Sequence, residues 1–264
     1  MTTTLESPSV YQTTPETLTP QQIADYRENG FVRLKGVISP KECATFRDAA
    51  TTINARAEAD GNGGRAVFNQ FVNNWRESEA LRGLTLHPNI TALARTLAGI
   101  ALRLWHDHLL VKKPHNNAPT HFHQDQPYWP HANSAQPLSA WVALNDVPVE
   151  RGCMTFIPKS QRYTELTAQN LHDAGSLFDL CPELQWDERV TLPLRAGDCT
   201  FHHGRCAHMA NDNLTDEHRY GYAIIYIDRT TTFAGRGHVV TKPLVEAGQL
   251  KEGDLLEGEL FPEI

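Results

Sequence analysis

The sequence lacks long apolar runs, paired cysteines and basic clusters. No stretch of about eighteen apolar residues occurs, which excludes a membrane-spanning helix. The five cysteines are odd in number, scattered and without a CxxC pair, so we expect neither a disulfide framework nor a structural zinc site. The absence of a Lys/Arg-rich run and a formal net charge of −7 argue against nucleic acid as a partner. We expect a cytoplasmic monomer or homodimer that binds a small molecule and neither nucleic acid nor membrane.

The N-terminus also lacks the features of a signal peptide. Residues 1–14 are rich in Thr and Ser, with no basic region and no apolar run. We predict a disordered leader over residues 1–17, followed by one domain over residues 18–264. A chain of 264 residues is long enough to bury one full core.

Helix signals are concentrated in the first hundred residues. Residues 19–22 (TPQQ) and 39–42 (SPKE) each combine a capping box with a proline at the first helical position. They predict helices that end at Gly30 and at about residue 58, separated by a short strand over residues 31–34. A third helix is expected from about residue 89 to 97, before Gly99.

Strand signals dominate the rest of the chain. Alternating or apolar runs bounded by turn residues predict strands at residues 101–113, 121–128, 138–147, 154–157, 190–194, 199–203 and 219–227. Helices followed by short strands indicate an α+β protein with a β-sandwich or barrel core. Residues 161–188 are long, polar and irregular, and are either a lid over a site or a surface excursion.

Residues 123–125 (HQD) carry the strongest chemical signal. Two residues apart on an extended strand, His123 and Asp125 project to the same side and can bind one metal together. A third histidine would complete the facial triad of non-heme Fe(II) oxygenases. Spacing alone leaves His202, His203 and His208 as candidates for it.

Arg219 opens an apolar strand, where a buried guanidinium needs an anion. The far carboxylate of 2-oxoglutarate would be such an anion. The alternative for this arginine is a surface salt bridge.

Four segments, in chain order, resemble the phytanoyl-CoA dioxygenase family. They are residues 29–32 (NGFV), 121–129 (HFHQDQPYW), 141–160 (WVALNDVPVERGCMTFIPKS) and 197–204 (GDCTFHHG), the last continuing through His208, Asn213 and Arg219. The resemblance covers roughly residues 18–230. It implies a double-stranded β-helix (jelly-roll) core with N-terminal helices packed on it, and the use of Fe(II), 2-oxoglutarate and O2.

The resemblance also implies roles for individual residues. His123, Asp125 and His208 would bind iron, and Arg219 would pair with the far carboxylate of 2-oxoglutarate. Lys113 and Trp141 would line the 2-oxoglutarate pocket, with Lys112 competing for the place of Lys113. Ala210 departs from the family pattern, because many members carry a small hydroxyl residue there.

The resemblance implies a dioxygenase that hydroxylates or otherwise oxidises a small molecule. Relatives that halogenate lack the metal-binding carboxylate, and Asp125 is present here. Gln70, Tyr128 and Trp129 are candidate substrate contacts; the alternatives are core packing for the two aromatics and a plain connection for Gln70. His106, His108, His115, His121 and His131 are interpreted as surface or pocket-wall residues.

The substrate and two rival functions remain open. We favour a natural product or metabolite over an acyl-CoA, because no basic cluster would receive the phosphates of CoA. A jelly-roll protein that binds a ligand without catalysis is the main rival. A zinc hydrolase is another, since three protein ligands with an open position also suit zinc.

Overall fold

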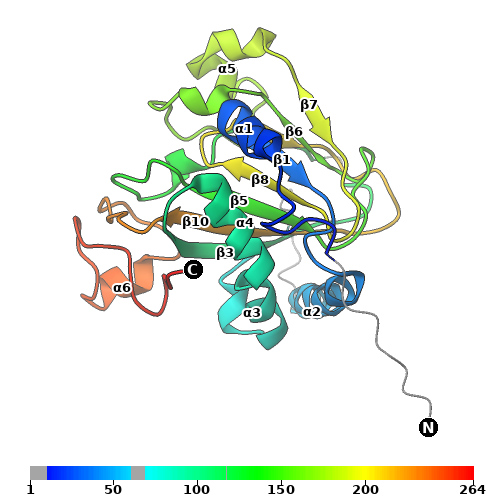
Figure 1. The fold of residues 1–264 in the computed structure, drawn as a ribbon, viewed down its shortest axis with the longest axis horizontal. Helices are drawn as coiled ribbons and strands as arrows, with labels where there is room; N and C mark the ends of the chain where they lie inside the picture. Colours follow the sequence, from blue (N-terminus) through cyan, green and yellow to red (C-terminus); the bar gives the residue numbers. More distant parts are fainter. Residues whose placement is uncertain (1–10, 61–68, 117) are drawn as a thin grey trace.

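The computed structural model describes residues 11–60, 69–116 and 118–264. Two antiparallel sheets form its core (Figure 1). The larger sheet has the order β1 (Phe31–Leu34), β8 (Cys199–His203), β5 (Leu138–Ala143), β10 (Arg219–Asp228), β3 (Leu102–Lys112), β2 (Asn69–Val72). The smaller sheet has the order β4 (Thr120–His123), β9 (His208–Ala210), β6 (Met154–Phe156), β7 (Val190–Leu192). The expected jelly-roll core with N-terminal helices is confirmed.

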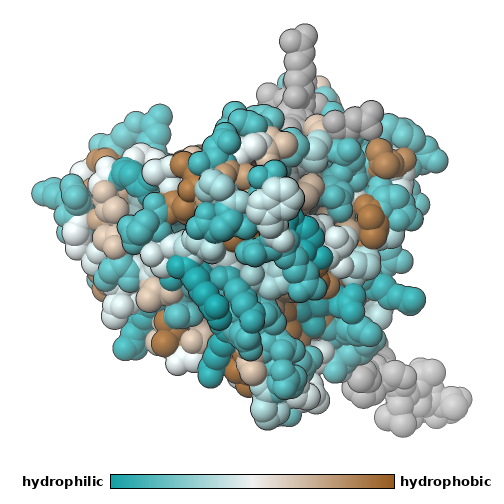
Figure 2. All heavy atoms as spheres, turned by 90° about the horizontal axis from the view of Figure 1, so that it is seen from above, coloured by the Kyte–Doolittle hydropathy of each residue, from teal (hydrophilic) through white to brown (hydrophobic). Residues whose placement is uncertain are grey.

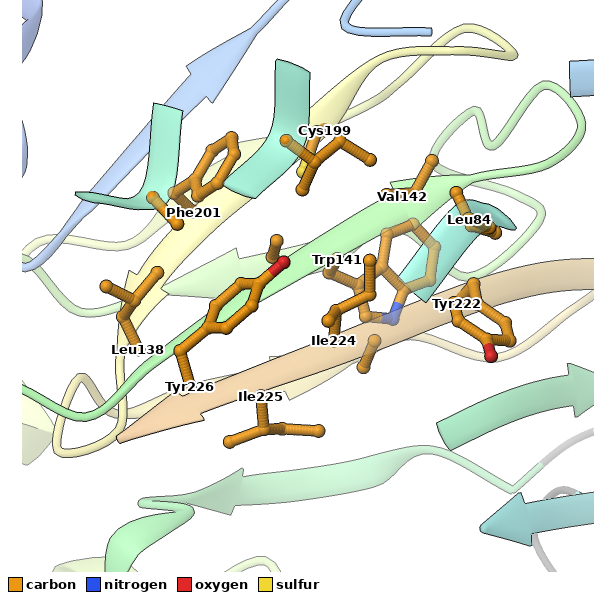
Figure 3. Close-up of a cluster of buried hydrophobic side chains, with 14 of the residues drawn as sticks. Leu84, Leu138, Trp141, Val142, Cys199, Phe201, Tyr222, Ile224, Ile225 and Tyr226 are labelled. Carbon is orange, nitrogen blue, oxygen red and sulfur yellow. The ribbon is translucent and has the colours of Figure 1, made fainter. Parts of the chain in front are cut away.

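The central strands β5 and β10 of the larger sheet are buried on both faces. Every residue of β5 and of β10 is buried, as expected for near-continuous apolar runs covered on two sides. Tyr222, Ile224 and Tyr226 pack toward the helix-covered face, while Ile225 points to the opposite face (Figure 3). Ile225 therefore lies on the inner face of the larger sheet, the face toward the smaller sheet, where it lines a cavity.

Four helices precede or flank the larger sheet: α1 (Pro20–Asn29), α2 (Pro40–Ala59), α3 (Glu79–Thr85) and α4 (Pro88–Ala98). Both predicted capping boxes form, from Thr19 to Gln22 and from Ser39 to Glu42. Gly30 ends α1 with φ 84°, a left-handed conformation that favours glycine. Helix α3, which the sequence analysis missed, begins at Ser78, whose side chain accepts a hydrogen bond from the backbone N–H of Leu81.

Several strand predictions need correction. The strand expected over residues 121–128 ends at His123, and a 3-10 helix, η2 (Gln126–Tyr128), follows it. The strand expected over residues 138–147 ends at Ala143. Strands β2 and β9 were not predicted; each is only a few residues long and is held by pairing with a distant strand.

The segment of residues 161–188 is more ordered than its polar sequence suggested. It begins within η3 (Ser160–Arg162) and contains α5 (Ser176–Leu180) and η4 (Pro182–Trp186). A small separate core beneath it is formed by Ile157, Leu177, Cys181, Leu184 and Ala207. The segment thus packs on the smaller sheet, and a role as a lid stays a prediction.

The two chain ends extend the domain. Residues 11–17, assigned to a disordered leader from the sequence, pack on it instead: Thr13 donates to the carbonyl of Lys35, and Asn89 donates to the carbonyl of Thr13. Residues 1–10 and most of the loop predicted at residues 60–64 lie outside the described residues. After β10 the chain forms one more short helix, α6 (Lys242–Glu246).

The surface is predominantly polar. Figure 2 shows hydrophilic residues over most of the visible face, with apolar residues scattered among them. Within the described ranges, no helix is both long and apolar enough to span a membrane.

Asp107 joins the larger sheet to the chain that covers it. Its carboxylate accepts hydrogen bonds from the backbone and side-chain nitrogens of Asn74 (2.8 and 2.7 Å) and from the backbone nitrogen of Trp75 (3.0 Å). Burial raises the pKa of Asp107, although these donors act in the opposite direction. The carboxylate thereby fixes η1 (Asn74–Arg76) and the start of the path to α3.

We predict that Asp107→Ala lowers the free energy of unfolding by about 2–4 kcal/mol, because buried N–H groups lose their acceptor. Urea denaturation followed by circular dichroism measures this change. Asp48→Ala, on the exposed side of α2, is the matched control and should be nearly neutral. Equal stabilities for the two variants would contradict the structural role of Asp107.

Candidate active site

A cavity of about 260 Å³ lies between the two sheets. His123, Met154 and His208 reach it from the smaller sheet, and Ser139, Trp141 and Arg219 reach it from the larger one. The cavity therefore brings residues predicted from distant parts of the sequence to one place.

His123, Asp125 and His208 form a cluster in this cavity. Potential ligand atoms of the three residues lie within 4.8 Å of one another. His123 and His208 are direct partners in the pairing of β4 with β9. Asp125 Oδ1 lies 3.5 Å from His123 Nε2 and 3.9 Å from His208 Nε2. Among the described residues, this is the one group with the composition and spacing of a metal site.

Asp125 reaches the cluster by a different route from the one predicted. It does not continue the strand: its φ of −74° and ψ of −43° are helical, at the start of η2. The turn after β4, not the alternation of a strand, aims its carboxylate at the two imidazoles.

Hydrogen bonds orient both imidazoles of the cluster. His123 Nδ1 lies 2.7 Å from the carbonyl oxygen of His121, and His208 Nδ1 lies 3.0 Å from that of Cys206. A carbonyl accepts only from N–H, so the proton sits on Nδ1 and each Nε2 keeps a free lone pair. This is the usual support of a metal-binding histidine.

Electrostatics favour a neutral His208 and an ionised Asp125. Burial, and then the proximity of His123, lowers the pKa of His208 to about 3. Burial would raise the pKa of Asp125, yet the neighbouring His208, His123 and His202 hold it well below its usual value. Two neutral imidazoles and one carboxylate with open positions suit Fe(II).

The other two histidines considered for the third ligand are placed differently. His203 accepts a hydrogen bond from the backbone nitrogen of Arg205 and contacts the carbonyl oxygen of Ala135 at 3.1 Å, away from the cluster. His202 Nε2 lies 3.5 Å from the outer oxygen of Asp125, Oδ2. The structure thus groups His208, and not His203, with His123 and Asp125.

Arg219 lies in the same cavity without a carboxylate partner among the described residues. It is 2% exposed, and its Nη1 donates to the carbonyl of Gly152 at 3.0 Å. No group of the described chain accepts from its Nε. Burial lowers the pKa of Arg219 to about 10, which still leaves it charged at neutral pH. A buried, incompletely satisfied guanidinium fits the carboxylate of a bound ligand.

The indole ring of Trp141 packs against the guanidinium of Arg219. The guanidinium carbon lies 5.3 Å from the centre of the indole ring. The ring occupies the space over Gly221 of β10, where an added Cβ would lie 2.0 Å from an indole carbon. Glycine is therefore required at this position for the indole to lie where it does.

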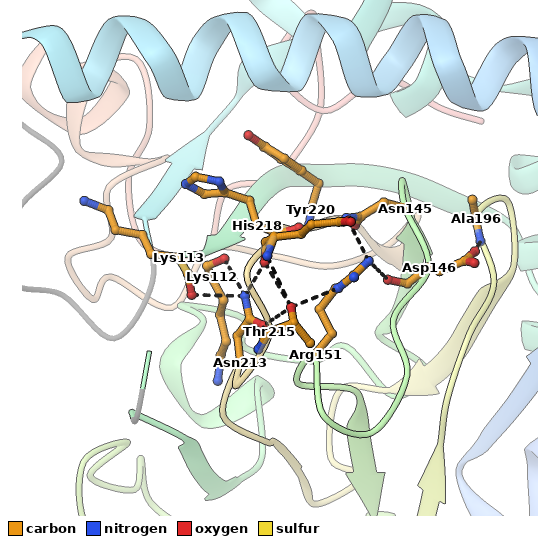
Figure 4. A network of polar contacts seen from close by, with 11 residues as sticks. Lys112, Lys113, Asn145, Asp146, Arg151, Ala196, Asn213, Thr215, His218 and Tyr220 are labelled. Carbon is orange, nitrogen blue, oxygen red and sulfur yellow. Dashed lines mark hydrogen bonds and ion pairs between the residues drawn. The ribbon is translucent and has the colours of Figure 1, made fainter. Parts of the chain in front are cut away.

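Lys113 is not brought to the cavity. Its ammonium lies 3.6 Å from Glu58 at the surface, and it does not line the cavity. Lys112, its competitor, donates instead to the carbonyl oxygens of Ala118, Ala210 and Asn211. In Figure 4 the side chains of Lys112 and Lys113 point in different directions. The side-chain amide of Asn213 donates to the backbone carbonyls of both lysines. The expectation that Lys113 lines the cosubstrate pocket is therefore not supported by its position.

The three candidate substrate residues all line the cavity: Gln70, Tyr128 and Trp129. Gln70 Nε2 lies 2.8 Å from His108 Nδ1. Tyr128 donates to the carbonyl of Gln169, and burial raises its pKa to about 12.

Two further histidines line the cavity, and the sequence analysis missed one of them. His108, interpreted from the sequence as a surface or pocket-wall residue, is confirmed in the wall, two residues before Leu110 on β3. His238 comes from the chain after β10, where no pattern indicated a site. Arg236, two residues earlier, donates to the carbonyls of Pro127 and Trp129 and so ties this segment to η2.

Comparison with known proteins agrees with this site. The family profile described as phytanoyl-CoA dioxygenase (PhyH) matches residues 26–221. The crystal structure of the non-heme alpha-ketoglutarate-dependent carbocyclase SnoK from nogalamycin biosynthesis is 37% identical, with a TM-score of 0.84 over 96% of this chain and 98% of that one. The epimerase SnoN, in complex with Fe3+, alpha-ketoglutarate and nogalamycin RO, is 36% identical, with a TM-score of 0.80 over 92% and 97%.

A curated relative extends the comparison. Phytanoyl-CoA dioxygenase domain-containing protein 1 of Rattus norvegicus is 23% identical, over 84% of this chain and 94% of its own length. The chain belongs to the phytanoyl-CoA dioxygenase family of Fe(II)- and 2-oxoglutarate-dependent oxygenases.

Proposed function

We propose that this enzyme oxidises an uncharged natural product or metabolite, by hydroxylation or a related oxidation, with release of succinate and CO2. One observation carries the proposal. A single cavity holds both a two-histidine, one-carboxylate cluster and a buried arginine without a carboxylate partner among the described residues.

In this proposal His123, Asp125 and His208 hold Fe(II), while Arg219, backed by Trp141, binds the far carboxylate of 2-oxoglutarate. Bound iron supplies the activation of O2 that is coupled to decarboxylation of the cosubstrate. The protein orients both molecules and excludes water. The apolar side chains of Met154, Leu171 and Ile225 in the cavity wall serve that exclusion.

The substrate end of the cavity is uncharged. Among the described lining residues, Asp125 is the only Asp or Glu and Arg219 the only Lys or Arg, and both are engaged by the metal and the cosubstrate in this proposal. Burial lowers the pKa of His108 and of His238 to about 4 each, so both imidazoles are neutral. With Gln70 they offer hydrogen bonds but no ion pair, which suits an uncharged molecule bearing hydroxyl or carbonyl groups.

This wall weighs against an acyl-CoA substrate, because Arg219 is its only Lys or Arg among the described residues and is assigned here to the cosubstrate. The relatives SnoK and SnoN, named for nogalamycin biosynthesis, favour a natural product. SnoK is a carbocyclase and SnoN an epimerase, so outcomes other than hydroxylation, such as ring closure, stand beside it in the proposal.

Two rival functions are less favoured. A jelly-roll protein without catalysis has no need of the complete cluster, and a zinc hydrolase has no use for Arg219. Anaerobic reconstitution with Fe(II) and 2-oxoglutarate, followed by exposure to O2 and a substrate screen, separates them. Iron-dependent succinate formation supports the proposal, and hydrolysis without 2-oxoglutarate supports the zinc enzyme.

We place the enzyme in the cytoplasm as a monomer or homodimer. All five cysteines are buried and free, which is compatible with a reducing compartment.

The metal ligands give the first test of function. His208→Ala and Asp125→Ala should each abolish succinate formation and weaken Fe(II) binding, while circular dichroism stays native. His172→Ala, an exposed histidine in the segment beside the smaller sheet, is the control and should leave both unchanged. Near-normal turnover by His208→Ala would remove it from the metal site.

Arg219 gives a second test. Arg219→Leu should raise the dissociation constant of 2-oxoglutarate at least a hundredfold, because an unpaired buried carboxylate costs about 3–5 kcal/mol. Its melting temperature without ligand should not fall, since the variant removes an unpaired buried charge. Arg33→Leu, at an exposed position of β1, is the control. Unchanged 2-oxoglutarate binding in Arg219→Leu would exclude the assigned role.

The product gives a third test. Because Asp125 occupies the ligand position that chloride would need, the wild-type enzyme should form no chlorinated product even in excess chloride. Mass spectrometry after reaction under ¹⁸O2 distinguishes hydroxylation, which adds labelled oxygen, from desaturation or cyclisation, which adds none. A chlorinated product would overturn the proposed chemistry.

A further inference from the structure

The two oxygens of Asp125 face different partners. Oδ1 faces the imidazoles of His123 and His208, as described above. Oδ2 lies 3.5 Å from His202 Nε2 and 3.5 Å from Ser139 Oγ. One oxygen is thus directed at the metal cluster and the other at the opposite sheet.

The two partners of Oδ2 form a pair in the larger sheet. His202 of β8 and Ser139 of β5 are directly opposite each other in the antiparallel register. Both line the cavity, and both are at most 2% exposed. Asp125, by contrast, follows β4 of the smaller sheet, so this contact spans the sandwich.

The surroundings of His202 favour a donor to the carboxylate over a metal ligand. Its ring centre lies 4.7 Å from that of His208 and 5.5 Å from that of Phe156. Its Nδ1 is buried and has no hydrogen-bond partner in the described chain. In His123 the Nδ1 proton is fixed by a carbonyl oxygen, whereas no acceptor holds a proton on Nδ1 of His202. The proton of His202 is therefore assigned to Nε2, beside the carboxylate, which leaves no lone pair there for a metal.

We propose that His202 is a positioning residue that, with Ser139, holds Oδ2 of Asp125 so that only Oδ1 is presented to the metal. The inference rests on the proposed function and deepens it. A carboxylate free to rotate could bind with both oxygens and occupy one more coordination position. Holding it by one oxygen keeps that position open for 2-oxoglutarate or O2. Partners that orient a ligand in this way usually contribute ten- to a hundredfold to metal affinity.

Three variants test this role, with Co(II) as an oxygen-stable probe of the metal site. His202→Phe keeps the volume of the ring but cannot donate. We expect its Co(II) dissociation constant to rise about 10–100-fold and its visible Co(II) spectrum to change with the coordination number. His202→Gln restores an N–H donor and should recover most of the affinity and the wild-type spectrum. His203→Gln, the neighbouring buried histidine that faces away from Asp125, should leave both unchanged.

A double-mutant cycle with Ser139→Ala adds a second readout. If both residues hold the same oxygen, the combined loss in His202→Phe with Ser139→Ala should differ from the sum of the single losses. Urea denaturation of each variant in the absence of metal separates a change at the site from a change in the fold.

Several outcomes would overturn the inference. Wild-type Co(II) affinity and spectrum in folded His202→Phe would show that His202 does not position the carboxylate of Asp125. Failure of both folded His202→Phe and His202→Gln to bind Co(II) would identify His202 as a ligand. A wild-type protein that binds Co(II) and forms succinate while His202→Phe is unaffected leaves the proposed function intact and removes only this role. A wild-type protein that binds neither Co(II) nor 2-oxoglutarate overturns both.

Discussion

The pairing of β4 with β9 is the constraint on which the site depends. In an antiparallel pair, residues directly opposite each other hold their side chains on the same face at close range. His123 opposite His208 therefore brings two imidazoles to ring centres 4.4 Å apart. A slip of one residue would turn one imidazole to the other face and dismantle the cluster.

The larger sheet carries the buried Arg219, and the smaller sheet carries His123 and His208. The outer face of the larger sheet is apolar and covered by helices, which allows its inner face to carry Arg219, His202 and Ser139 in a cavity. The two sheets thus carry different groups: the smaller sheet and the turn after β4 carry His123, Asp125 and His208, and the larger sheet carries Arg219 and the two contacts of Asp125 Oδ2. The core shared by the two sheets fixes their relative position. It therefore also fixes the distance between the histidine cluster and Arg219.

Local signals in the sequence predicted local structure well. The capping boxes at Thr19 and Ser39 are satisfied within a few residues, so helices α1 and α2 could be recognised without the rest of the fold. Strand β9 could not, because three residues show no periodicity and are held by partners far away in the chain. The choice of His208 rested on resemblance for the same reason.

The walls of the cavity were the least predictable part. Asp125 was expected to reach the metal by strand alternation, whereas a helical turn directs it there. Lys113 was expected to line the cosubstrate pocket. It is the first residue after β3, and its ammonium contacts Glu58 at the surface instead. His238 arrives from a loop beyond the last strand, where neither periodicity nor motif is present.

Gly221 has no side chain, and this absence lets the indole of Trp141 occupy its place in the cavity wall. Any side chain there would collide with Trp141, so the indole, which packs against the guanidinium of Arg219, would have to move. The guanidinium would then move relative to the histidine cluster. In the proposed complex, the space for a diacid between Arg219 and the histidine cluster therefore depends on a residue that does not line the cavity.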